Sequence, residues 1–426
     1  MNKCLIAGLI GSCFALPALA QTSVQIYGIA DAGVMWQKGG PTKIISGGAD
    51  GSRIGFKGTE EIGNGYKAIF NLEARVELDT GTQQPTLIND NRGFYLARGL
   101  DAFNAADPRI AAGLRAALYV PGAPAVNQEK ALFDRTAMVG LVTPVGAVLL
   151  GRMYTPGYEV FAAADAFESG TAGTWGGITG GTAGFTALGA DIRSQKSIQY
   201  RIAHPSGFGG SIMYGARNSG YLGRYNKFRA AAVTYKANGF DLGLGYNHGY
   251  DQQNRPSLRT FTAGGSYTMD AFKFFAGFHS QRNDNSALIA DYLGAWDASI
   301  APALAAQPVV VRTALRNTFQ TIMRANTLQD ANSYQVGLHY KLGSGRVMAS
   351  YAHQNDRTAS NSDADLFALG YDYFLSKRTD IYTVAAIIKN QNDGQYTPGT
   401  AGSPGGFTKL PGEDGRAFQV GIRHRF

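Results

Sequence analysis

The chain has 426 residues, a formal net charge of +8 at pH 7, 56 glycines, 22 tyrosines and 23 phenylalanines, a composition that favours many strands joined by tight turns. The basic residues are spread along the chain, which argues against a nucleic-acid-binding protein. No stretch after residue 20 offers the roughly 20 continuous apolar residues of a transmembrane helix, so a helical membrane protein is excluded and a membrane β-barrel is not.

Residues 1–20 have the pattern of a cleaved secretory signal peptide. Lys3 supplies the positive end, an apolar stretch follows, and Ala18-Leu19-Ala20 forms the small-x-small cleavage pattern. A lipoprotein box ending at Cys13 is the alternative, but it would leave a very short apolar core. We therefore expect a signal peptide over 1–20 and one barrel domain over 21–426.

The mature chain would contain no cysteine, because Cys4 and Cys13 both lie in the signal peptide. It would not use disulfide bonds, although an exported protein could form them. Without Lys3 the charge balance becomes 38 − 31 = +7.

Apolar and polar residues alternate with a period of two from the mature N-terminus to the last residue. In 23–34, for example, Val24 and Ile26 fall on one face and Gln25 and Tyr27 on the other. Each such stretch predicts a strand with two unlike faces. The terminal stretch 417–426 keeps the same rhythm and ends on Phe426.

The connections between these strands alternate strictly between short and long. Seven short turns are predicted, at 62–65, 143–146, 204–207, 237–239, 270–271, 343–345 and 375–377. Eight long connections fall between them, at about 38–51, 79–133, 156–193, 218–225, 250–256, 283–331, 355–362 and 389–415. Fifteen connections join sixteen strands, and this pattern predicts an up-and-down outer-membrane barrel with short periplasmic turns.

A barrel in lipid has no free sheet edge, so the first and last strands must pair. We expect 417–426 to close onto 23–34, with Phe426 at the periplasmic interface, where aromatic residues gather. Helices are predicted inside the long connections, over 104–118, 286–296 and 311–319, where they pack the loops against each other.

Four stretches together resemble the trimeric general porins of Gram-negative outer membranes, and the β-proteobacterial type most. They are "VQIYGIADAGV" (24–34), "SRIGFKGTEEIGNGYKAIFNLE" (52–73), "GLVTPVGAVLLGRMYTP" (140–156) and "GIRHRF" (421–426). The resemblance implies an all-β, sixteen-stranded antiparallel transmembrane barrel in a homotrimer, with the third external loop, about 156–193, folded inward to narrow the pore. It also implies contact with outer-membrane lipid and lipopolysaccharide, and assembly by the barrel-assembly machinery, for which the C-terminal Phe426 acts as a signal.

The resemblance further implies a pore constriction in which loop acids face a wall of arginines. Strict alternation by itself points Arg53, Lys57 and Arg75 into the lumen, opposite Ile54 and Phe56. The other members rest on the resemblance. The basic wall would comprise Arg53, Lys57, Arg75, Arg135, Arg152 and Arg193. The loop acids would be Glu159, Asp165, Glu168 and Asp191. Arg346, close to the turn at 343–345, is expected to lie away from the constriction.

These features predict a passive diffusion channel for small hydrophilic solutes and ions. Inward basic residues and the charge of +7, opposed by Glu73, Glu77 and the loop acids, predict a weak preference for anions. Such a channel is not an enzyme and needs no cofactor and no nucleic acid.

Two alternatives remain at this stage. A substrate-specific channel would be favoured by a run of lumen aromatics, for which Tyr27 and Tyr200 are the candidates. A barrel hydrolase would use His248 or His279 with a nearby Asp or Ser. The six histidines have no metal-ligand spacing, so no metal site is predicted.

Overall fold

The computed structural model describes residues 23–83, 131–179, 192–220, 223–287, 289–399, 406–408 and 410–426. The predicted signal peptide, the predicted helix over 104–118 and the predicted loop acid Asp191 lie outside these ranges. No helix among the described residues is both long enough and apolar enough to cross a membrane.

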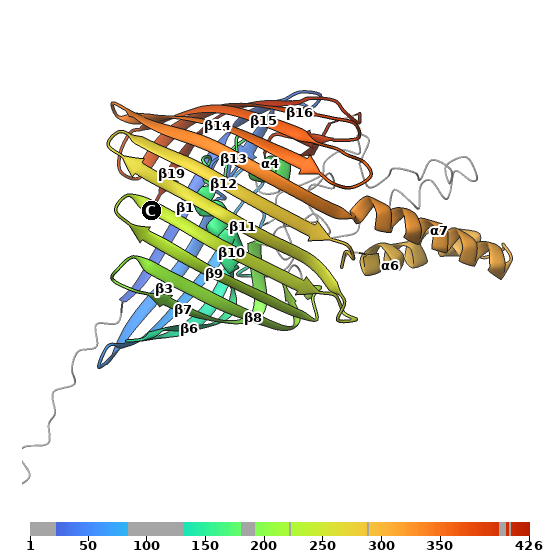
Figure 1. Cartoon of the computed structure of the whole chain (residues 1–426), viewed down its shortest axis with the longest axis horizontal. Coiled ribbons are helices and arrows are strands. Elements are labelled where there is room, and N and C mark those ends of the chain that lie inside the picture. Colours follow the sequence, from blue (N-terminus) through green and yellow to red (C-terminus); the bar gives the residue numbers. More distant parts are fainter. Residues whose placement is uncertain are drawn as a thin grey trace, which may run out of the picture.

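Seventeen hydrogen-bonded strands form one sheet that closes on itself (Figure 1). One of them, β2 (Lys43–Ser46), is a short strand beside β1 in the first long connection, which leaves 17 − 1 = 16 strands around the wall. These are β1 (Ser23–Gln37), β3 (Arg53–Gly63), β4 (Tyr66–Arg75), β5 (Thr136–Thr143), β6 (Gly146–Tyr154), β7 (Arg193–Ala203), β8 (Phe208–Gly220), β9 (Lys227–Ala237), β10 (Phe240–Tyr250), β11 (Pro256–Met269), β12 (Phe272–Asn283), β13 (Gln329–Leu342), β14 (Gly345–Asp356), β15 (Ala364–Phe374), β16 (Thr379–Asn390) and β19 (Gly415–Arg425). The predicted antiparallel, sixteen-stranded architecture is confirmed.

The barrel closes between its first and last strands. β19 runs antiparallel to β1, from the pair Ile29 and Arg425 to the pair Gln37 and Ala417. The main-chain N–H and C=O of Phe426 both hydrogen-bond to Gly28, at 3.1 Å each. The Phe426 ring lies where a side chain at Gly28 would project, so only glycine fits there.

Short turns gather at one end of the barrel and long connections at the other, as predicted (Figure 1). The turn end holds, for example, the two-residue connections between β9 and β10 and between β11 and β12. The loop end carries α3 (Pro156–Ala164), α4 (Gly176–Thr179), α6 (Ile289–Ser299), η3 (Ala301–Leu304), α7 (Val309–Thr327) and the small ladder of β17 (Tyr396–Thr397) and β18 (Gly406–Phe407).

The helices α6 and α7 project beyond the barrel as a hairpin (Figure 1). They pack through Trp296 and Phe319, whose ring centroids are 4.8 Å apart and whose side chains are buried. The predicted helices in this loop therefore exist, but α7 is longer than the predicted 311–319 because its C-terminal turns add Met323 to the shared core.

Alternation separates an apolar exterior from a polar interior. On β10, Leu242 and Leu244 are exposed on the outside, whereas Asn247 on the opposite face is 1% exposed. Two assignments from sequence are wrong. The first is part of the subunit contact, for which the small and apolar residues Ala30, Ala32, Met138 and Gly140 are predicted to share the outer face. Met138 and Gly140 instead face inward, because a side chain at Gly140 would meet those of Leu149 and Ile69.

The second wrong assignment is Tyr200, which was a candidate for the lumen. It shares the exposed face of β7 with Ile198 and Ile202, and its hydroxyl donates to the main-chain carbonyl of Val145 in a turn, at 2.6 Å. Tyr27 does face the lumen, because its hydroxyl donates to Asn71 at 2.8 Å.

Candidate pore constriction

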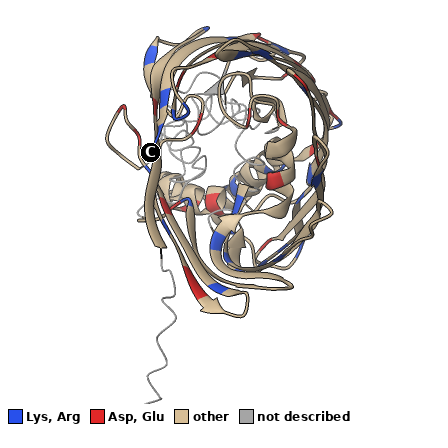
Figure 2. Cartoon of the chain, turned by 90° about the vertical axis from the view of Figure 1, so that its left-hand side faces the viewer, with Lys and Arg blue, Asp and Glu red and all other residues tan. Residues whose placement is uncertain are grey.

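The third long connection folds into the barrel and lies against the inner wall. Figure 2 looks into the barrel from the turn end and shows this helical segment inside the ring of strands. Helix α3 begins with Thr155, whose side chain caps the N–H of Tyr158, and with Pro156 at the first helical position. Asn247 of β10 fixes this end by bonding both to Gly157 N, at 3.0 Å, and to Thr155 Oγ1, at 3.1 Å.

Strand glycines make room for α3 on the wall. A Cβ atom at Gly245 would lie 2.8 Å from the Cα of Gly157, and one at Gly243 would lie 2.8 Å from Val160 Cγ2. Both distances are shorter than a real contact allows, so the helix sits closer than any other residue would permit. These glycines therefore position the loop that narrows the pore.

Asp165 organises the loop beyond α3. Its carboxylate accepts hydrogen bonds from the N–H groups of Phe167, Ser169 and Trp175 and from the hydroxyl of Thr174. Burial raises the pKa of this carboxyl, although these hydrogen bonds oppose the shift. At 1% exposure Asp165 does not line water, so the structure gives it a role inside the loop instead of the predicted place among the pore acids.

Glu168 fastens the tip of the loop to the opposite wall. Its two carboxylate oxygens accept from Arg346 Nη1 and Nη2, at 2.6 and 2.8 Å. Enclosure by the wall would raise the pKa of Glu168, but the hydrogen bonds and charge of Arg346 lower it to about 2. Arg346 also bonds Asp372 of β15. It lies beside the turn before β14, as expected, but the inward loop reaches it there through Glu168.

Glu159, on the lumen side of α3, pairs with Arg201 of β7. Both side chains are more than a third exposed, which places this pair in contact with lumen water. Of the predicted loop acids in the described residues, Glu159 and Glu168 keep exposed side chains, and each pairs with an arginine that the sequence analysis did not assign to it.

On the other side, three arginines from three different segments converge. Arg135 Nε donates to Glu73 Oε1 at 2.6 Å, and Arg53 lies 3.9 Å from the other oxygen of Glu73. Arg135 and Arg193 both donate to the hydroxyl of Tyr154, at 3.0 and 2.7 Å. The predicted residues Arg53, Arg135 and Arg193 are therefore brought together around Glu73 and Tyr154.

The first long connection adds an acid to this cluster. Asp50 pairs with Arg53, and it lies 3.8 Å from Arg423 of β19. Gly51 follows it, and its carbonyl accepts from Arg53 Nε at 2.7 Å. A Cβ atom at Gly51 would lie 3.1 Å from a guanidinium nitrogen of Arg75 and 3.1 Å from one of Arg135. The absence of a side chain at Gly51 therefore allows both guanidinium groups to lie close to the main chain.

The remaining predicted cations occupy different environments. Arg75 pairs with Glu77 and is buried. Arg152 donates from Nε to the main-chain carbonyl of Asp134 at 2.6 Å. Lys57 is exposed, with its amine 5.0 Å from the centre of the Tyr27 ring.

The local charge is slightly positive. Arg53, Arg135 and Arg193 face Asp50 and Glu73, which gives 3 − 2 = +1. Within the described part of the chain, Arg193 makes no ion pair and instead lies over the Tyr154 ring, 4.3 Å from its centre. Arg53 keeps the most contact with water among these three, at 14% side-chain exposure.

Four aromatic rings stack along the loop, which the sequence analysis did not detect. Tyr154, Tyr158, Phe161 and Trp175 follow one another at centroid distances of 5.4, 6.5 and 4.7 Å. Phe161 and Trp175 are buried at 5% and 0% exposure, so the stack docks the loop and does not form a solute track along the lumen. Burial raises the pKa of the Tyr158 hydroxyl to about 12, which keeps it neutral.

Asp50, Arg346 and Arg423 were missed because they are distant in sequence from the residues they contact, and the closed barrel brings them together. Tyr154 directly precedes the loop and stacks on its Tyr158. For Arg423 a signal did exist, since it alternates with the outward residues Val420 and Ile422 on β19.

The described residues give little support to a metal site or to the hydrolase alternative. Within those ranges, no group of three or more His, Asp or Glu side chains has the arrangement of a metal site. His279 is enclosed by Phe161 and Trp175 and bonds Thr262 at 2.9 Å, while His248 contacts Tyr246 and Tyr250. Neither histidine is joined to the nearby Asp and Ser that the hydrolase alternative required.

Comparison with known proteins agrees with this geometry. The family model described as "Gram-negative porin" matches residues 6–393. Outer-membrane porin proteins of Bordetella pertussis and of Delftia acidovorans are each 26% identical; the first alignment covers all of both chains and the second covers 96% of this chain and 95% of the relative.

Among solved structures, the anion-selective porin from Comamonas acidovorans superposes with a TM-score of 0.67 at 22% identity, over 95% of this chain and 100% of that one. The trimer form of OmpT, an outer membrane protein of Vibrio cholerae, gives a TM-score of 0.56 at 14% identity, over 95% and 99% of the two chains. The fold, the inward loop and the family match lead to one conclusion: the chain belongs to the Gram-negative porin family and forms a diffusion channel in the outer membrane.

Proposed function

We propose that this chain is a general porin with a weak preference for anions, acting as a homotrimer. The observation that carries the proposal is the convergence of Arg53, Arg135 and Arg193 on Glu73 and Tyr154, beside the inward loop that bears Glu168. Small hydrophilic solutes cross passively between these two groups, and their passage needs no catalytic residue.

The preference is weak because both signs of charge line the path. An anion near the arginine cluster meets a local balance of 3 − 2 = +1, while Glu159 and Glu168 add negative charge on the inward loop. Ions within about 10 Å of these charges feel them with little screening at about 0.1 M salt. The resemblance in fold to a protein described as an anion-selective porin is consistent with this sign.

The predicted wall residues divide into two groups in this proposal. Arg53 and Lys57 keep contact with water and meet the solute directly. The buried cations do not touch the solute but add to the positive electrostatic potential around Arg53 and Lys57. This second group comprises Arg75, Arg135, Arg152 and Arg193, none more than 7% exposed.

The proposed subunit contact uses the exterior of β1, where the small side chains of Ala30 and Ala32 permit a close approach. We expect an oligomer that stays intact in detergent and dissociates on boiling. A gel of unboiled protein, checked by mass photometry, tests this, and monomer as the sole species in both measurements would refute the trimer. Assembly by the barrel-assembly machinery, with cleavage of residues 1–20, belongs to the same proposal.

Reversal potential in planar bilayers tests the selectivity. With a tenfold gradient of potassium chloride, we expect a potential of anionic sign well below the limit of about 59 mV for an ideally selective channel. A potential of zero, or one of cationic sign, would contradict the proposed preference. A protein that inserts but carries no current would contradict the channel itself.

A further inference from the structure

A short segment of the first long connection, residues 47–52, bulges out of the wall. β2 and β3 both pair with β1 and are continuous along it except for these six residues, which stand opposite only Ala30 and Asp31. A strand cannot fit six residues into the space of two, so the segment leaves the sheet. It bulges into the lumen, because Thr171 of the inward loop donates from its N–H to the carbonyl of Gly48, at 2.8 Å.

Asp31 of β1 holds both ends and the middle of this segment. Its main-chain carbonyl accepts from the N–H of Gly47 and from the hydroxyl of Ser52, both at 2.8 Å. Its carboxyl oxygen Oδ2 accepts from the N–H groups of Ala49 and Asp50, at 2.9 and 2.7 Å. Asp31 is 0% exposed, so its side chain fixes the segment and does not meet the solute.

Tyr382 of β16 supplies the third hydrogen bond to this carboxyl group. Its hydroxyl donates to Asp31 Oδ1 at 2.6 Å, and its side chain is buried as well. A Cβ atom at Gly48 would lie 2.4 Å from the hydroxyl oxygen, so the segment passes directly beside it. Because a buried carboxyl group that lacks a donor is destabilised, loss of the hydroxyl should weaken the hold of Asp31 on the segment.

Gln419 of β19 joins the segment to the inward loop. Its side-chain amide donates to the carbonyl of Gly48 at 3.1 Å and accepts from the N–H of Ala172 at 2.9 Å. A Cβ atom at Gly170 would lie 1.7 Å from the carbonyl oxygen of Ala49, so the two main chains are in direct contact. The lumen is therefore narrowed by two segments that pack on each other, of which the sequence predicted only the second.

The segment brings the acid Asp50 to the arginine cluster. The side chain of Asp50 is 34% exposed, pairs with Arg53 and lies 3.8 Å from Arg423. Glu73, the other acid of the cluster, has a side chain that is only 7% exposed. An ion that passes Arg53 thus meets the charge of Asp50 directly, and the position of Asp50 decides how much of the positive potential is cancelled there.

We propose that Asp31, Tyr382 and Gln419, which we call the Asp31 network, tune the ion selectivity of the pore. All three are 0% exposed, so they act as positioning residues. The network keeps Asp50 beside Arg53, where its negative charge limits the preference for anions. The inference rests on the proposed channel function and deepens it, because it names what sets the charge balance of the constriction.

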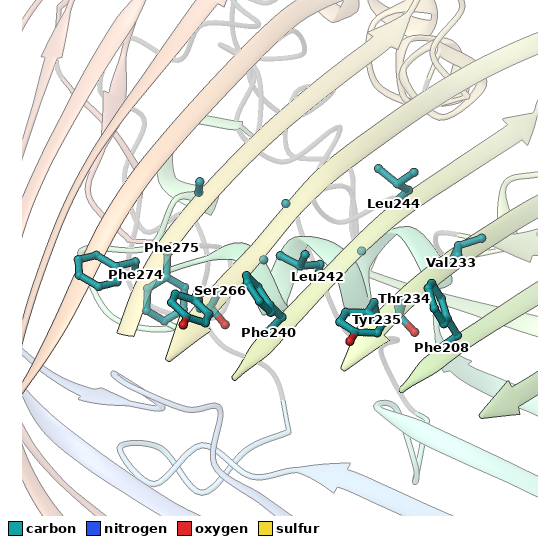
Figure 3. Close-up of a pocket in the computed structure, with 15 residues that line it drawn as sticks. Phe208, Val233, Thr234, Tyr235, Phe240, Leu242, Leu244, Ser266, Phe274 and Phe275 are labelled. Atoms are coloured by element: carbon teal, nitrogen blue, oxygen red, sulfur yellow. The ribbon is translucent and has the colours of Figure 1, made fainter. Parts of the chain in front are cut away.

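The test uses a substitution that changes no charge. Tyr382→Phe removes the hydroxyl bound to Asp31, and Asp50→Asn removes the charge that the network positions; both single variants and the double variant are compared with the wild type. Tyr235→Phe is the matched control, because it removes the same group from a tyrosine in the apolar groove on the barrel exterior (Figure 3). Reversal potential in a tenfold gradient of potassium chloride gives the ratio of anion to cation permeability for each protein.

Asp50→Asn changes the local balance from 3 − 2 = +1 to 3 − 1 = +2. One unit charge at about 8 Å should then raise the ratio of anion to cation permeability about twofold. Tyr382→Phe should raise the ratio in the same direction, by up to the same factor, because the loosened segment lets Asp50 move away. In the Asp50→Asn background Tyr382→Phe should change nothing further, and the control should behave like the wild type.

Equal permeability ratios in the wild type and in folded Tyr382→Phe would overturn the proposal. A change that persists in the Asp50→Asn background would also overturn it, since the tyrosine would then act on the pore without Asp50. Heat-modifiable mobility shows whether each variant is folded. If Tyr382→Phe does not fold, Gln419→Leu takes its place in the same comparison, because it removes the hydrogen bonds to Gly48 and Ala172 without a change of charge.

Failure of the network and failure of the proposed function give different results. A wild type without anion preference would refute the proposed selectivity but not the network, because the network is judged by the change from one variant to the next. An anion-selective wild type whose permeability ratio does not respond to Tyr382→Phe would refute the network and leave the proposed function intact.

Discussion

Replacing Arg53 by glutamate should reverse the sign of charge at the constriction. Arg53 is the cluster member with the most contact with water, and it faces Asp50 and Glu73. The local balance of 3 − 2 = +1 would become 2 − 3 = −1, because Arg135 and Arg193 remain and a third acid joins Asp50 and Glu73. The predicted outcome is a channel that prefers cations.

The size of the change follows from Coulomb's law. At about 8 Å in water one unit charge is worth about 0.5 kcal/mol, which screening at about 0.1 M salt reduces to about 0.2 kcal/mol. A change of two charges then amounts to about 0.5 kcal/mol for each ion, with opposite sign for anion and cation. The permeability ratio should therefore change about fivefold, or on the order of 30 mV of the roughly 59 mV available across a tenfold gradient.

The assay is reversal potential in planar bilayers, with Arg53→Gln as an intermediate step. Arg346→Glu is not a suitable control, because Arg346 binds Glu168 of the inward loop. Arg316→Glu replaces it, since Arg316 pairs with Asp297 on the external hairpin and should leave the potential unchanged. A folded Arg53→Glu channel whose potential stays within about 5 mV of the wild type would refute the assignment of Arg53 to the constriction.

Three further predictions concern the loop and the closure of the barrel. Glu168→Gln should loosen the loop and increase current noise at pH 7, whereas in the wild type the noise should rise only in acid. The sign follows because Arg346 lowers the pKa of Glu168 to about 2. The ion pair therefore stabilises the loop fully above the ordinary pKa of a glutamate, about 4.3, and this stabilisation is lost as the pH falls through about 2. Single-channel traces that are equally quiet for both proteins at pH 7 would contradict this. Gly245→Val should push α3 off the wall and change the conductance, because even a Cβ there would lie 2.8 Å from main-chain atoms of the helix; unaltered conductance in a folded variant would disprove the close contact. Deletion of Phe426 should reduce the amount of assembled protein at the cell surface more than it alters conductance, because its main chain closes the sheet on Gly28; normal surface levels would count against this role.

The sequence by itself determined the barrel. A strand in which apolar and polar residues alternate has one apolar and one polar face. Because short and long connections alternate, the short ones lie together at one end of the barrel and the long ones at the other. The number of strands, the direction of Arg53 and Lys57 and the closure of β19 onto β1 all followed from those two local patterns.

Only the tertiary structure decided which charges meet. Asp165 and Glu168 are three residues apart, yet one is enclosed by its own loop and the other reaches across to Arg346. Alternation predicts whether a side chain points into or out of the barrel, but it does not predict which residue that side chain contacts. Contacts inside a closed barrel join residues that are far apart in the chain. The pairing of Asp50 with Arg423 and of Glu168 with Arg346 exists only once the sheet has closed and the loop has folded into it.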